Sequence, residues 1–140
     1  MDLPGTWTLV AWRRVVDGGT TTYPLGEDAE GMLVYTDDGR MAVTLTAAKR
    51  PSMPDNDPLG GDVEDRADAY STCLAYIGTY ELRDDAVVHR IDLSLYPQWA
   101  GAEQVRAFTY TGDELVLKTP PVQGPDGTIV NELAWRRQPR

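Results

Sequence analysis

Residues 87–106, VVHRIDLSLYPQWAGAEQVR, show an alternation that decides the fold class. Neighbouring side chains on a strand point to opposite faces, so every second residue belongs to one face. The residues predicted to face inward are Val87, His89, Ile91, Leu93 and Leu95. PQWAG then marks a turn, and AEQVR begins a returning strand. The stretch therefore predicts two antiparallel strands joined at a rim, with the only histidine of the chain on the buried face.

Seven further segments have the same strand character, and Asp-Gly or Gly-Asp turn signals separate several of them. They are residues 6–15, 31–36, 40–46, 75–83, 103–111, 114–119 and 128–137. With residues 86–95 they give about eight short strands with mostly short connections. This pattern predicts an all-β fold, an up-and-down antiparallel barrel, with a sandwich as the alternative. Residues 1–140 are expected to form a single domain.

Residues 47–74 depart from the strand pattern. A Pro-rich loop is followed by a predicted short helix over residues 62–74, with Asp62 capping its start and acidic residues in its first turn. Its apolar residues recur at helical spacing. They are Val63, Ala67, Tyr70 and Leu74. The helix is expected either to plug one end of the barrel or to lie as a lid over a pocket.

The composition excludes several classes of function. A net charge of −9 argues against binding to nucleic acid or to an anionic membrane surface. One cysteine and one histidine are too few for a usual zinc site, and no phosphate-binding glycine motif is present, so we expect neither metal nor cofactor. Cys73 cannot form an internal disulfide. The start of the chain lacks signal-peptide character and no stretch is long and apolar enough to span a membrane, so we expect a cytoplasmic protein.

The predicted inner faces combine aromatic and polar residues. Besides His89, those that bear on a site are Met41, Tyr76, Tyr80, Gln104, Arg106, Phe108 and Tyr110. Unpaired buried polar groups cost a few kcal/mol each, so this mixture favours a ligand-filled cavity over a solid core. Alternatives remain open for each residue. Arg106 would reach solvent from a strand end, the tyrosines would lie at the rim, or His89 would be a neutral core ring bonded to a carbonyl or a tyrosine.

Two ends of the chain carry a family resemblance. Gly5-Thr6-Trp7 resembles the Gly-x-Trp signature of lipocalins and related calycin barrels, in which an arginine of the last strand packs over the tryptophan ring. LAWRR supplies Arg136 or Arg137 for that role. GTWTLVAW, PLGEDAEGMLVYTDDGRMAV, AYIGTYEL, VVHRIDLSLYPQWAGAEQVR and ELAWRR together resemble the bacterial and fungal lipocalin-like domain family. The resemblance implies a compact antiparallel β-barrel with an interior pocket.

Related barrels in microbial natural-product pathways include cofactor-free cyclases, some of them pericyclases, and others that bind small molecules. The resemblance and the inner face together suggest a cofactor-independent cyclase or isomerase, a pericyclase among the options, that folds a hydrophobic polyketide-type intermediate. The alternatives are a non-catalytic binding barrel for a hydrophobic small molecule and a structural domain filled by side chains. A homodimer is also left open.

The expected roles follow from side-chain chemistry. His89 would move a proton, while Arg106 and Tyr80 would donate hydrogen bonds to a carbonyl that gains negative charge. The remaining residues are expected to contact substrate. They are Tyr76, Gln104, Trp99, Phe108, Tyr110 and Met41.

Overall fold

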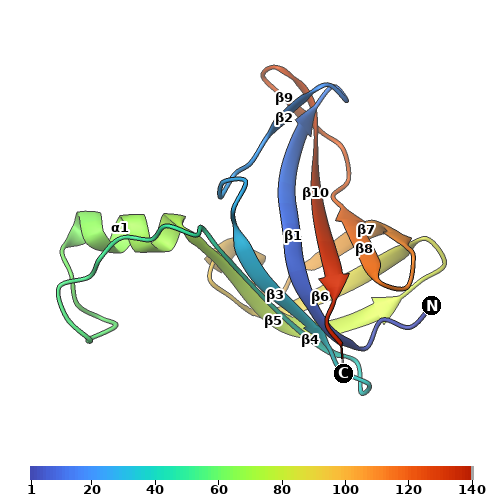
Figure 1. Ribbon diagram of the computed structural model, residues 1–140, viewed down its shortest axis with the longest axis horizontal. Coiled ribbons are helices and arrows are strands. Elements are labelled where there is room, and N and C mark those ends of the chain that lie inside the picture. The colour runs from blue at the N-terminus through green and yellow to red at the C-terminus, as the bar shows by residue number, and fades with distance from the viewer. Residues whose placement is uncertain (140) are drawn as a thin grey trace.

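The computed structural model describes residues 1–139, most of which lie in antiparallel strands (Figure 1). The elements are β1 (Gly5–Val16), β2 (Thr20–Thr22), β3 (Glu30–Tyr35), β4 (Arg40–Thr46), α1 (Val63–Ser71), β5 (Cys73–Leu82), β6 (Ala86–Ser94), η1 (Pro97–Trp99), β7 (Glu103–Tyr110), β8 (Glu114–Lys118), β9 (Val122–Gly124) and β10 (Gly127–Arg137). Neighbouring strands pair in the order β1-β3-β4-β5-β6-β7-β8-β10, and β10 returns to β1 to close a barrel. The predicted eight-stranded up-and-down barrel is therefore confirmed.

Two short strands lie outside the predicted set. β2 pairs with the end of β1, and β9 pairs with the start of β10, so that both extend beyond the barrel wall (Figure 1). All three residues of β2 are exposed. A strand that buries nothing has no apolar alternation, which is why the sequence pattern did not reveal it.

A β-bulge changes the phase of β1. Leu9 pairs with Trp135 while Ala11 pairs with Ala134, so Val10 is the additional residue. Before the bulge the buried residues have odd numbers, as at Leu9. After it, Trp12 and the even-numbered residues turn toward the barrel interior.

A second bulge lies on β6 opposite Gly78. Gly78 pairs with Ile91 and Ile77 pairs with Leu93, which leaves Asp92 as the extra residue. The predicted inward face therefore holds only as far as Ile91, and the prediction for Leu93 is wrong, since this side chain is 66% exposed. Leu95, also predicted to face inward, lies at the rim, where it is 37% exposed and lines the interior cavity.

The predicted helix forms over α1 but is shorter than expected. Asp62 caps it through a reciprocal pair of hydrogen bonds with Asp65, in which each backbone N–H donates to the other side chain. Continuation to residue 74 is wrong because Cys73 and Leu74 pair with β4 as the start of β5. None of the described residues 63–71 is buried, and the helix projects from the barrel wall (Figure 1), so it does not plug an end.

The end of the barrel near both termini is sealed around Trp7. This ring is fully buried, and its Nε1 donates to the carbonyl of Leu3 at 3.0 Å. The guanidinium carbon of Arg137 lies 4.2 Å from the Trp7 ring centroid, and Nη1 donates to the carbonyl of Pro4 at 3.0 Å. Arg137 therefore takes the predicted stacking role, while Arg136 pairs with Glu114 on the surface.

Substitution of Arg137 by alanine is expected to lower the free energy of unfolding by about 2–3 kcal/mol, because a desolvated cation–π contact and its hydrogen bonds to carbonyls are lost together. Urea unfolding measures this change. Arg136→Ala is the matched control, since it removes only an exposed ion pair worth about 0–1 kcal/mol. Equal losses in the two variants would show that stacking on Trp7 does not stabilise the sealed end.

Candidate functional site

The barrel contains a cavity of about 380 Å³ away from the sealed end. Aliphatic side chains form much of its wall. They are Leu25, Leu33, Val43, Leu45, Leu74, Leu95, Leu117 and Leu133. Tyr70 and Ser71, at the end of α1, and Trp99 of η1 also line it.

His89 lies in the cavity wall between two tyrosines. It is 2% exposed, with Nε2 2.6 Å from the hydroxyl of Tyr35 and Nδ1 2.7 Å from the hydroxyl of Tyr76. A neutral imidazole has one donor and one acceptor nitrogen, so one tyrosine donates to the ring and the other accepts from it. Of the roles left open for His89, this geometry matches a neutral ring bonded to tyrosine.

The electrostatics keep this trio uncharged near neutral pH. Burial, assisted by the positive charge of Arg106, lowers the pKa of His89 to about 3. Burial raises the pKa of Tyr76 to about 12 and raises the pKa of Tyr35 well above its ordinary value. With both nitrogens occupied and a low pKa, His89 fixes the positions of the two hydroxyls and has no free nitrogen to act as a base.

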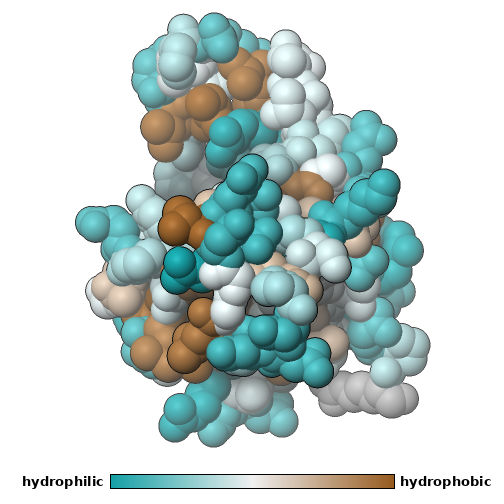
Figure 2. Space-filling model, turned by 90° about the vertical axis from the view of Figure 1, so that its left-hand side faces the viewer, coloured by the Kyte–Doolittle hydropathy of each residue, from teal (hydrophilic) through white to brown (hydrophobic). Residues whose placement is uncertain are grey.

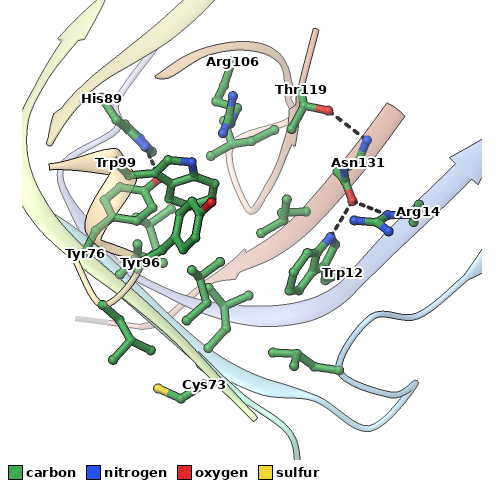
Figure 3. Close-up of a pocket in the computed structure, with 18 of the residues that line it drawn as sticks. Trp12, Arg14, Cys73, Tyr76, His89, Tyr96, Trp99, Arg106, Thr119 and Asn131 are labelled. Carbon is green, nitrogen blue, oxygen red and sulfur yellow. Dashed lines mark hydrogen bonds between the residues drawn. The ribbon is translucent and has the colours of Figure 1, made fainter. Parts of the chain in front are cut away.

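Arg106 brings a cation into the same wall. It is 9% exposed, and Figure 3 shows its guanidinium reaching into the cavity. Nη2 donates to Oε1 of Gln104 at 2.9 Å and Nη1 to the backbone carbonyl of Val105 at 3.4 Å. Burial lowers the pKa of Arg106, and the nearby Tyr76 and Tyr35 act in the opposite direction.

An aromatic corner covers one side of the cavity. The ring of Trp99 meets Tyr76 edge-on at 6.0 Å between centroids and meets Tyr96 at 5.6 Å. Pro97 begins the short η1 turn that carries Trp99 to this position. The PQWAG segment therefore supplies a rim and a part of the cavity wall together (Figure 3).

A polar cluster lies across the cavity from this corner (Figure 3). Nε1 of Trp12 donates to Oδ1 of Asn131 at 2.9 Å, and Nε of Arg14 approaches the same oxygen at 3.5 Å. The backbone N–H of Asn131 donates to Oγ1 of Thr119 at 2.9 Å. Because Arg14 is exposed, its charge is screened by water in a way that the charge of Arg106 is not.

Comparisons with known proteins agree with this architecture. The family model described as "Lipocalin-like domain" matches residues 4–138. The chain belongs to this family. It is also 33% identical, over 65% of its own length and 93% of the other protein, to the 4'-hydroxy-3'-methoxypropiophenone carrier protein ppsC of Aspergillus oryzae. No solved structure matches the chain.

The lipocalin-like barrel brings together only part of the predicted site. His89, Arg106, Tyr76 and Trp99 line the cavity. Gln104 meets it indirectly, through its hydrogen bond to Arg106.

The other predicted site residues lie elsewhere in the barrel. Met41 is buried in the core outside the cavity lining, and Tyr80 donates to the carbonyl of Thr36 at 2.8 Å. Phe108 and Tyr110 line a separate hollow of about 520 Å³ with Met1 and Leu82. Within residues 1–139 no helix has the length and hydrophobicity needed to cross a membrane.

Several residues that line the cavity were not predicted from the sequence. Trp12 and Arg14 face inward only because of the bulge at Val10, since regular alternation from Trp7 would send both outward. The one signal for them in the sequence is Trp12 itself, because it is a second tryptophan in a strand whose first tryptophan, Trp7, belongs to the core. Asn131 of β10 pairs with Arg14 of β1, so its place in the cavity could be predicted only from the register of these two strands.

Proposed function

We propose that the barrel binds a hydrophobic small molecule of natural-product biosynthesis in this cavity. The observation that carries the proposal is an interior space with aliphatic and aromatic walls and a few convergent polar groups, which is the usual make-up of a small-molecule site. Its volume of about 380 Å³ falls within the range of ligand pockets.

The name of the Aspergillus oryzae relative supports an aromatic ligand. It specifies a carrier of an aryl ketone that bears one hydroxyl and one methoxy group. The rings of Trp99, Tyr96 and Tyr76 would stack on such a molecule, and the polar groups of the wall would receive its oxygens.

Isothermal titration with 4'-hydroxy-3'-methoxypropiophenone tests the proposal. Leu133 is a partly buried residue of the wall, so Leu133→Trp fills the cavity and is expected to weaken binding by roughly tenfold or more. Met32→Trp is the matched control, because this residue lies on the outside of the barrel and is 55% exposed. Binding that is equally strong in both variants would place the ligand outside the cavity.

A cofactor-independent cyclase or isomerase acting on a polyketide-type intermediate is the second candidate. The position of Arg106 favours it, because a buried guanidinium stabilises a carbonyl oxygen that gains negative charge. The enclosed wall would also hold a flexible chain in a reactive conformation. The test is incubation with a linear precursor. A product distribution and rate equal to those without protein would leave binding as the function.

A further inference from the structure

We infer that the ligand carries an anionic oxygen group, such as a carboxylate, an enolate or a phenolate, and that Arg106 receives this group inside the cavity. The inference rests on the proposed function and specifies its ligand class. It concerns the charge of the ligand, which neither the family nor the name of the relative gives.

The distribution of charge is the first argument. The chain has 22 acidic and 13 basic residues, yet the cavity lining within residues 1–139 includes Arg14 and Arg106 and no aspartate or glutamate. The outer face drawn in Figure 2 is mostly hydrophilic, with hydrophobic residues in separate patches. Acidic residues are thus kept out of the one space where they would neutralise Arg106.

The partners of Arg106 are the second argument. Both of its hydrogen bonds go to neutral oxygens, those of Gln104 and Val105, and no ion pair to it is found in the described part of the chain. A guanidinium has five N–H donors in a planar fork, so several remain for a ligand. A buried cation without a counter-ion is costly, and a ligand oxyanion that forms paired hydrogen bonds with the fork would offset that cost.

The surroundings of Arg106 are the third argument. His89 and Tyr76 are also in the wall, and both are uncharged near neutral pH because of their burial. They neither compete with a ligand anion nor add a second charge that would attract a dianion. The hydroxyl of Tyr76 is already bonded to His89, so Arg106 is the buried charged group of the wall, whereas Arg14, which also lines the cavity, is exposed to solvent.

The test compares two ligands that share a phenyl-terminated chain of four carbons and differ in the terminal group, an anionic carboxylate in one and a neutral hydroxyl in the other. N-phenyl-1-naphthylamine, a neutral fluorescent probe, is bound first and is then displaced by 4-phenylbutyrate or by 4-phenylbutanol. We expect the wild-type protein to prefer the anion by roughly tenfold or more, as charge-assisted hydrogen bonds predict. Arg106→Gln should abolish the preference while the probe still binds. Arg136→Gln, the matched control at a surface arginine outside the cavity lining, should keep it.

The outcomes separate this inference from the proposed function. Failure of the wild-type protein to bind the probe would overturn the proposed function and the inference with it. Probe binding with equal displacement by the two compounds, or an anion preference that survives Arg106→Gln, would overturn the inference alone. A thermal measurement gives an independent check. Arg106→Met without ligand should melt no lower than wild type, because a neutral side chain replaces an unpaired buried cation. A clear loss of thermal stability would contradict the inference.

Discussion

Replacing Gly78 by alanine should prevent the barrel from folding in its present form. A Cβ at this position would overlap the carbonyl oxygen of Arg90, which lies just before the bulge on β6. The obstacle is backbone, so no side-chain rotation relieves it, and the pairing of β5 with β6 would have to break. We expect a loss of at least about 4 kcal/mol in the free energy of unfolding, measured by urea denaturation.

Gly19→Ala is the control for this substitution. Nothing lies within 4 Å of a Cβ built on Gly19, and the expected change is within about 0.5 kcal/mol. If Gly78→Ala unfolded at the same urea concentration as Gly19→Ala, the bulge would not have the geometry described for it.

Acidification from pH 7 to pH 3 should remove about 4 kcal/mol of stability through His89 alone. The pKa of this ring is about 3 in the folded protein and 6.5 in the ordinary reference state. Between these values the unfolded chain binds the proton more readily, so stability is complete above pH 6.5 and is lost as the pH falls toward 3. Each unit of pKa difference corresponds to about 1.4 kcal/mol. Urea unfolding at a series of pH values measures the slope.

His89→Gln isolates this contribution from that of the carboxylates. Glutamine keeps a donor and an acceptor for the two tyrosines but does not titrate. The wild-type protein should therefore lose stability more steeply than the variant between pH 6.5 and pH 3. Parallel curves for the two proteins would mean that the ring can take up a proton in the folded state without penalty.

Local pattern was enough to predict the barrel. Alternation in β4 and β7 predicted correctly which side chains face inward, since each of these strands has one buried face. Trp7 of the Gly-x-Trp motif and Arg137 each lie ten residues or fewer from an end of the chain, so their contact could be predicted without knowing how the middle of the chain folds.

The position of an inward-facing residue along the barrel axis could not be predicted from the local sequence pattern. Tyr80, Phe108 and Tyr110 belong to inward-facing rows, as predicted, but they lie outside the lining of the main cavity. Alternation assigns a face and says nothing about position between the two ends. The extra residues Val10 and Asp92 caused a different kind of error, because each bulge reverses the inward–outward phase of its strand and neither bulge has a Gly or Pro at the extra residue to mark it.

The seal formed by Trp7, Leu3 and Arg137 also governs how fast a ligand comes and goes. With one end closed, we expect a ligand to enter and leave at the other end of the barrel, by a single route, and Tyr70 at the end of α1 lines the cavity there. A change at this mouth that does not touch the bound molecule must alter the association and dissociation rates by the same factor. Residence time can then be tuned at the mouth while the equilibrium affinity, which is set deeper in the barrel, stays constant.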